Sequence, residues 1–284
     1  MNKINKKYIL IGTAISLFIT FLTASCVGKK DKIAENPPGY DLSKPKKYGM
    51  PDNLQEISGI SFNKGDNTFV YAQQDEDGRL FKLPLGTKDE TKTRFAKKGD
   101  YEDVTIINNW AILLKSNGDL FSFPLSETKN TETTNVKENI GLVPKGEYEG
   151  VFADEESGQV YIICKNCKED KDSKLTSGYT LTFQNNGTLK LKGTFKIDAG
   201  KIDKFRPSAL AIHPLTKEWY IVSSVNKALV ILDAKWQVKN VYHLNSNTFN
   251  QPEGIAFDKD GNLYISNEGS ETQAGNILRF DYKK

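Results

Sequence analysis

The sequence predicts an all-β fold, a five-bladed propeller with four antiparallel strands in each blade. From residue 54 onward, short runs rich in Ile, Val, Phe, Tyr, Thr and Leu alternate with Asp, Asn and Gly, which is typical of strands joined by turns. No convincing helical period extends beyond two turns. One pattern, a small or acidic residue that opens an apolar strand followed by a turn and further strands, recurs five times, as in repeat folds.

The five repeats open with similar tripeptides at comparable intervals. They are Ser58-Gly59-Ile60, Glu102-Asp103-Val104, Glu149-Gly150-Val151, Ser208-Ala209-Leu210 and Glu253-Gly254-Ile255. The intervals are 44, 47, 59 and 45 residues, and the longest contains a polar insertion at residues 165–177. A blade of about 49 residues lies within the range of known propeller repeats.

The outer strands complete four of the five blades. A fourth strand is expected in each of the first four repeats, for example at residues 91–96 and 238–244, whereas the fifth repeat ends at residue 284 with three strands. Residues 40–45, before the first repeat, are predicted to supply the missing strand, because closing the ring removes its free edges. A six-bladed NHL-like propeller is the alternative, and it requires a further repeat that the sequence does not offer.

Residues 1–25 are predicted to be an export signal. A basic start leads into an apolar run at residues 8–22, which is shorter than the roughly 20 residues that span a bilayer comfortably. The run ends in Ala24-Ser25-Cys26, which resembles the lipobox of bacterial lipoproteins and predicts lipidation of Cys26. The alternatives are a cleaved secretory peptide and an uncleaved anchor. Residues 26–39, which have hardly an apolar residue, are predicted to be a flexible tether, and the propeller is predicted over residues 40–284.

This N-terminus predicts a lipid-anchored protein of the bacterial cell envelope, periplasmic or exposed at the surface. Of the 39 Lys and Arg residues, three lysines lie in residues 1–25, which contain none of the 36 Asp and Glu residues. The remainder is formally neutral, so nucleic acid is excluded as a partner. The mean hydropathy of -0.52 excludes a polytopic membrane protein. We expect a monomer.

The residue that opens each inner strand is predicted to lie nearest the propeller axis. Three carboxylates and two hydroxyls would meet there, from Ser58, Glu102, Glu149, Ser208 and Glu253. Confined like charges repel one another unless a cation neutralises them. Hard oxygen ligands without imidazole or thiolate favour Ca²⁺, and the chain has only two histidines. The alternative is a channel that holds only water.

Other candidate sites are less specific. Residues 75–78 and 258–261 begin like calcium loops but lack the Glu at the twelfth position, which indicates hairpin turns. Cys164 and Cys167 have no second pair with which to bind zinc, and in an exported chain they predict a disulfide, with free thiols as the alternative. The residues that follow the second strands are predicted to rim the channel unless they are solvated loop ends: Gln74, Lys115, Lys165, Ser224 and Asn267.

Several short motifs behind the lipoprotein signal resemble one known family. They are Leu-Gln-Glu-Ile-Ser-Gly-Ile at 54–60, Pro-Glu-Gly-Ile-Ala-Phe at 252–257 and Asp-Gly-Asn-Leu-Tyr at 260–264. Together they resemble the SdiA-regulated (YjiK/CarP-like) family of bacterial lipoprotein β-propellers over about residues 40–284. The resemblance implies an extracytoplasmic propeller with a link to calcium.

The order of the axial residues, Ser, Glu, Glu, Ser, Glu, is also similar to the central calcium site of five-bladed calcium-activated nucleotidases. Two functions are therefore expected. The first is a ligand- or partner-binding module in which Ca²⁺ joins the blades, and the second is a calcium-dependent hydrolase of nucleotides or phosphate esters. The sequence shows no matching phosphate-binding arginines or catalytic acid motif, which favours the binding module.

Overall fold

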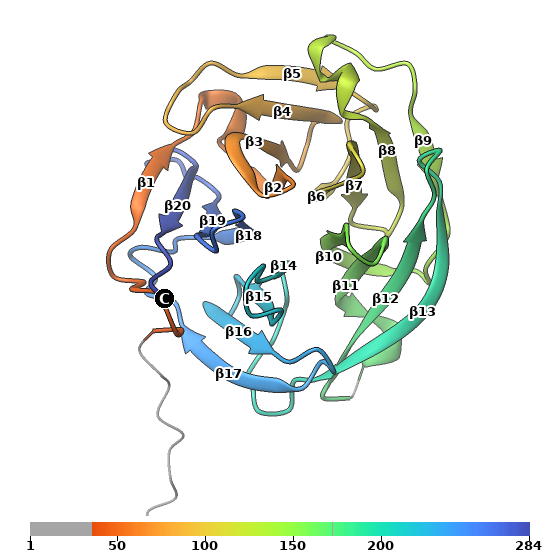
Figure 1. Cartoon of the computed structure of the whole chain (residues 1–284). Coiled ribbons are helices and arrows are strands. Elements are labelled where there is room, and N and C mark those ends of the chain that lie inside the picture. The colour runs from red at the N-terminus through yellow and green to blue at the C-terminus, as the bar shows by residue number, and fades with distance from the viewer. Residues whose placement is uncertain (1–35, 172) are drawn as a thin grey trace, which may run out of the picture. The chain divides into compact units, whose positions relative to one another are not determined.

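The computed structural model describes residues 36–171 and 173–284. They form five four-stranded sheets, and Figure 1 shows these sheets as blades around a central axis. The sheets confirm the five-bladed propeller, and the described residues contain no sixth sheet. The predicted export signal (1–25), Cys26 and most of the tether lie outside the described residues.

Each blade is a meander of neighbouring antiparallel strands. Blade 1 contains β2 (Ile57–Asn63), β3 (Asp66–Gln74), β4 (Arg79–Leu83) and β5 (Thr91–Arg94). Blade 2 contains β6 (Tyr101–Ile107), β7 (Trp110–Lys115), β8 (Leu120–Pro124) and β9 (Lys137–Asn139). Blade 3 contains β10 (Gly146–Asp154), β11 (Gln159–Cys167), β12 (Leu175–Phe183) and β13 (Leu189–Asp198).

The last two blades differ in how they are completed. Blade 4 contains β14 (Ala209–Ile212), β15 (Trp219–Ser223), β16 (Ala228–Leu232) and β17 (Val238–His243). Blade 5 contains β18 (Pro252–Phe257), β19 (Leu263–Asn267), β20 (Asn276–Phe280) and the N-terminal β1 (Lys46–Gly49). The 3₁₀ helices are η1 (Asp52–Leu54), η2 (Leu125–Lys129) and η3 (Lys168–Asp170). No helix within residues 36–171 and 173–284 is both long and apolar enough to cross a membrane.

The hydrophobic core is divided among the five junctions between neighbouring blades. One cluster of buried side chains lies at each junction. At the junction of blades 3 and 4, Trp236 stacks on Phe195 and on Trp219, with ring centroids 3.6 and 4.3 Å away. The middle strands β15 and β16 are buried along their whole length, because neighbouring blades cover both of their faces. The outer strands are mostly exposed and rich in lysine.

An N-terminal strand closes the ring as predicted, but the prediction that residues 40–45 form it was wrong. β1 pairs with β20 from Lys46–Arg279 to Gly49–Asn276. Residues 40–45 form turns instead, because Tyr40 and Leu42 are both buried between blades 4 and 5. The Tyr40 hydroxyl also donates a hydrogen bond to the carbonyl of residue 261 at 2.5 Å. The apolar anchor therefore precedes the strand instead of forming part of it.

Candidate functional site

One end of the central channel is an acidic cavity of about 320 Å³, which we call the acidic mouth. All five residues predicted to face the axis line it, one from each blade: Ser58, Glu102, Glu149, Ser208 and Glu253. The other lining residues are Asp75, Asp100, Ser116, Glu147, Lys165, Gln251 and Glu268. Seven carboxylates and one ammonium group therefore border this cavity.

Irregularities in strand pairing place the axial side chains. In the pairing of β6 with β7, the partners on either side of Glu102 are consecutive residues, so Glu102 is an extra residue without a partner. The same shift occurs at Glu149 in β10 and at Glu253 in β18, and a related shift includes Ser58 in β2. Ser208 lies directly before β14. Bulges re-aim side chains, so these shifts explain how the axial residues leave the sheets.

The next residue of each inner strand forms a narrow layer below the axial residues, which we call the waist. The waist consists of Gly59, Asp103, Gly150, Ala209 and Gly254. A Cβ atom on Gly59 would lie 2.2 Å from Asp103 Oδ1, and one on Gly254 would lie 2.4 Å from the Ser58 carbonyl oxygen. At Gly59 and Gly254 only glycine, which has no side chain, allows the strands to approach this closely.

Asp103 links the inner strands of blades 2 and 3 at the waist. Its Oδ1 accepts the N–H of Val104 and its Oδ2 accepts the N–H of Val151 in β10, both at 2.8 Å. Burial raises the pKa of the Asp103 carboxyl well above its usual range, although both backbone donors oppose the shift. Asp103 is therefore a structural link between blades 2 and 3.

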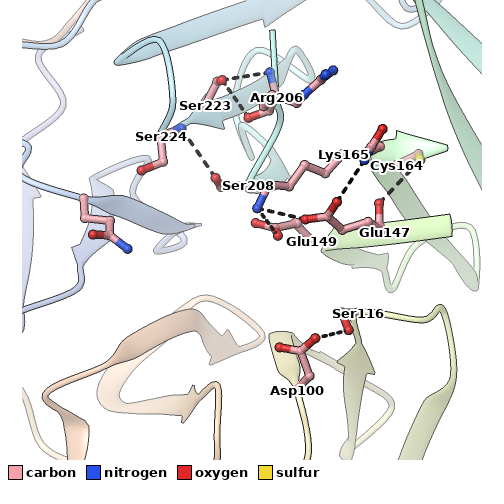
Figure 2. Close-up of polar contacts among 12 residues, drawn as sticks. Asp100, Ser116, Glu147, Glu149, Cys164, Lys165, Arg206, Ser208, Ser223 and Ser224 are labelled. Carbon is pink, nitrogen blue, oxygen red and sulfur yellow. Dashed lines mark hydrogen bonds and ion pairs between the residues drawn. The ribbon is translucent and has the colours of Figure 1, made fainter. Parts of the chain in front are cut away.

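Lys165 is the cation of the acidic mouth. Its Nζ lies 2.5 Å from Glu149 Oε1 and 3.3 Å from Glu147 Oε1. Figure 2 shows the Lys165 side chain extending from blade 3 toward Glu149, in the neighbourhood of Ser208. Burial alone would lower the pKa of Lys165, but Glu149 and Glu147 raise it above its usual value. The ammonium group therefore stays charged.

The other four predicted rim residues do not line the acidic mouth. Gln74 accepts the N–H of Glu76, and Lys115 lies over the Tyr101 ring with Nζ 6.0 Å from the centroid. Ser224 donates its N–H to the Ser208 hydroxyl, and Asn267 is fully buried.

In three blades the lining residue is the one that follows the predicted position. Asp75, Ser116 and Glu268 line the cavity, each directly after the end of a second strand. A further group, Asp100, Glu147 and Gln251, lies two residues before the axial residues of its own blade. Because strand side chains alternate with a period of two, counting back by two from each axial residue would have found this group.

Three carboxyls of the acidic mouth hold their protons more tightly than free carboxyls do. Burial, with the charges of Glu149 and Asp100, raises the pKa of Glu102 to about 9. Burial raises the pKa of Glu149 to about 7 although Lys165 opposes the shift, and burial also raises the pKa of Glu268 to about 7. Burial is the largest cause of all three shifts and nearby carboxylates add to it, so the charged forms of these groups are disfavoured unless a cation joins them.

A second candidate lies beside the acidic mouth in β11. Cys164 and Cys167 form a disulfide in the structure, and counting thiols by mass spectrometry after alkylation of the native protein would test it. In the described residues, the group with potential ligand atoms all within 4.8 Å of one another is Cys164, Cys167 and Asp170. Bonded cysteines have no thiolate to offer a metal. The three axial glutamates do not form such a group.

Fold and site together define a five-bladed β-propeller with an acidic cavity at one end of its channel. The chain belongs to the SdiA-regulated family, whose model matches residues 37–271. The match confirms the resemblance found in the sequence. The comparison with curated proteins gave no match.

Solved structures share the fold at low sequence identity. Glutaminyl cyclase from Myxococcus xanthus has a TM-score of 0.54 at 14% identity, over 84% of this chain and 96% of that chain. Regucalcin from Agrobacterium tumefaciens, described as a calcium-binding protein, has a TM-score of 0.53 at 11% identity, over 88% and 97%. A luciferin-regenerating enzyme has a TM-score of 0.52 at 8% identity, over 84% and 95%. These proteins share an architecture, and function has to be argued from the site.

Proposed function

We propose that this chain is a lipid-anchored propeller of the bacterial cell envelope that binds Ca²⁺ at its acidic mouth and acts as a ligand- or partner-binding module. The observation that carries the calcium proposal is the convergence of the five axial residues on one cavity with seven carboxylates and one ammonium group. A divalent cation would stabilise the charged forms of Glu102 and Glu149, whose pKa values are raised by burial and, to a smaller extent, by neighbouring carboxylates.

The donor set fits Ca²⁺. The lining residues offer carboxylate, hydroxyl and amide oxygens and no imidazole or thiolate, and Ca²⁺ accepts such hard oxygen donors in adjustable arrangements. Glu102, Glu149 and Glu253 bring negative charge from three blades, and Ser58 and Ser208 bring hydroxyls from the other two. When bound, Ca²⁺ would supply the positive charge that joins the blades. The regucalcin likeness is one of fold, so the proposal rests on these donors.

Thermal melting of the full chain in detergent, in CaCl₂ and in excess EGTA, tests the proposal. A ligand that binds only the folded state stabilises it by about 2.7 kcal/mol at a hundredfold excess over its dissociation constant. For a propeller of this size we expect chelation to lower the melting temperature by roughly 5 to 10 °C. Native mass spectrometry should count one bound ion. Coincident melts without a copurifying metal would reject the calcium site.

The membrane anchor is a separate part of the proposal and rests on the sequence at Cys26. Labelled palmitate should enter the wild-type chain in bacterial cells and be absent from Cys26→Ala. A thioether-linked diacylglycerol together with an N-acyl chain would give stable anchoring, because a single acyl chain gives only marginal binding. Equal labelling of both chains would reject the anchor.

Charge favours binding over hydrolysis. Enzymes that transfer phosphoryl groups surround the phosphate with cations that stabilise its charge. The acidic mouth has one lysine beside seven carboxylates. We therefore expect no calcium-dependent release of phosphate from ATP, ADP, GDP or simple esters. A turnover of about 1 per second, which is below the median for enzymes, would favour the hydrolase instead.

A further inference from the structure

Blade 3 differs from the other blades at the end of its second strand. In the pairing of β10 with β11, Glu147 lies opposite Asn166 and Tyr148 lies opposite Cys164, so Lys165 is an extra residue without a partner. β11 thus carries an irregularity of its own, facing the one that places Glu149. The Cys164–Cys167 disulfide spans this irregularity. Lys165 is therefore aimed into the channel from a covalently closed segment.

The position of the Lys165 ammonium group makes it a counter-ion inside the acidic mouth. Its shortest contact is with Glu149 Oε1, at 2.5 Å. Only 8% of the Glu149 side chain is exposed, compared with 43% of the Glu147 side chain. The ammonium group therefore has one buried partner and one that faces the solvent. It can leave Glu149 without losing all its ionic contacts, because Glu147 remains within reach at the edge of the cavity.

A metal ion and this ammonium group would use the same carboxylate. Glu149 is an axial residue, and its Oε1 already accepts a hydrogen bond from Lys165. Two cations cannot both occupy the inner side of one carboxylate without strong repulsion, because like charges a few ångströms apart repel strongly in a partly buried site.

We propose that Lys165 is a tethered competitor that sets the affinity of the acidic mouth for divalent cations. The inference rests on the proposed calcium site. Binding of Ca²⁺ moves the ammonium group from Glu149 outward to Glu147, and release of Ca²⁺ lets it return. The lysine thereby keeps the empty cavity partly neutralised. It also weakens calcium binding, so that the site responds to high rather than trace concentrations of the ion.

Isothermal titration calorimetry of Ca²⁺ binding to the full chain in detergent tests this proposal. Lys165→Met should bind Ca²⁺ about tenfold more tightly than the wild type, which corresponds to about 1.4 kcal/mol. Lys165→Arg keeps the charge and should stay close to the wild type. Lys115→Met is the matched control, because Lys115 ends the second strand of blade 2 and does not line the acidic mouth. It should leave the affinity unchanged.

Lysine footprinting gives a second readout that does not depend on a variant. Acetylation of Lys165 in the wild-type chain, followed by peptide mass spectrometry, should be several times faster in CaCl₂ than in EGTA. The rate at Lys115 should not change. If Lys165→Met fails to fold, an equal acetylation rate at Lys165 in both conditions still overturns the proposal.

The outcomes separate this inference from the proposed function. Equal calcium affinity of the wild type and Lys165→Met would overturn the competitor and leave the calcium site standing. If Lys165→Met binds Ca²⁺ and the wild type does not, Lys165 prevents calcium binding altogether, which supports the proposed competition. If neither chain binds Ca²⁺, both proposals are wrong.

Discussion

The two ends of the channel are built from the same five strands and have opposite chemistry. At the acidic mouth the inner strands present Ser58, Glu102, Glu149, Ser208 and Glu253. Two residues further along, the same strands present Ile60, Val104, Val151, Leu210 and Ile255 to a second cavity of about 440 Å³, which we call the opposite mouth. The waist residues between them line neither cavity. The strand irregularities and the waist thus divide one channel into two environments.

The mouths also differ in charge balance. The charged residues that line the opposite mouth are balanced, with three lysines (Lys64, Lys217 and Lys259) and three acidic residues (Asp154, Glu155 and Asp258), and Lys64 pairs with Glu155 at 3.6 Å. The acidic mouth has seven carboxylates and one lysine. Folding that brings uncompensated charges together is destabilising and has to be offset by other contacts. Balanced charges near the surface change the stability little. The difference therefore favours the acidic mouth as the functional end.

The largest effect is expected at the waist, from Asp103→Ala. The substitution leaves the N–H groups of Val104 and Val151 without their acceptors in a buried layer, and unsatisfied buried donors destabilise by about 1 to 3 kcal/mol each. We expect urea denaturation to show a loss of about 3 kcal/mol. Asp103→Asn retains one acceptor oxygen and should lose less. A loss below about 1 kcal/mol for Asp103→Ala would mean that Asp103 is not what fastens the waist.

The next effect separates the two mouths by their response to calcium. Glu149→Gln removes an axial charge and should abolish most of the calcium-induced rise in melting temperature, which we expect to be roughly 5 to 10 °C in the wild type. Glu155→Gln at the opposite mouth is the matched control and should retain the full rise. Loss of the response in both variants, or in neither, would contradict a calcium site confined to the acidic mouth.

The acidic mouth should also make stability depend on pH. The pKa values of Glu102 and Glu149 are raised from 4.5 to about 9 and about 7 by burial. In metal-free protein the unfolded chain loses these protons near its ordinary pKa while the folded chain retains them. Stability should therefore fall as the pH rises from about 4.5 to about 9.

Calcium competes with these protons, so calcium-induced stabilisation should grow over the same pH range. Melting temperatures measured in EGTA and in CaCl₂ from pH 5 to pH 9 should diverge as the pH rises. Parallel curves would show that the titrating carboxyls do not bind the ion.

The repeat and the axial positions could be predicted from the sequence because they recur. Each of the five predicted inner strands begins with a Ser or Glu residue, and the repeat places that residue at the axis whatever the details of strand pairing. All five of these residues line the acidic mouth. The rim could not be predicted equally well. Placing a strand end one residue early turns the side chain to the other face, which is why the sequence predicts Gln74 and Asn267 at the rim instead of Asp75 and Glu268.

Lys165 shows the other limit of sequence reasoning. It was predicted as one of five equivalent rim residues, but its direction depends on the strand irregularity in β11, which only the register of the pairs reveals. The closing strand is a similar case. Residues 40–45 and β1 both suit a strand in the sequence, and the burial of Tyr40 in the core between blades 4 and 5 decides between them.

The smallest effect is expected from the ion pair at the opposite mouth. Lys64 in blade 1 reaches Glu155 in blade 3, and their side chains are 57% and 35% exposed. Exposed pairs contribute at most about 1 kcal/mol, because solvent screens the charges and ordering two long side chains costs entropy. Lys64 also has a positive φ of 55°, so any substitution there changes the backbone energy as well as the charge.

A double-mutant cycle with Lys64→Gln and Glu155→Gln removes that complication, because the backbone contribution is common to both backgrounds and cancels. We expect a coupling energy of about 0.5 kcal/mol from urea denaturation at low salt, and less at 1 M NaCl, where the Debye length is about 3 Å. A coupling above about 2 kcal/mol that survives high salt would mean that this pair is shielded from solvent like the Lys165–Glu149 pair. The two mouths would then differ in net charge but not in the strength of their ion pairs. Net charge alone would distinguish the functional end.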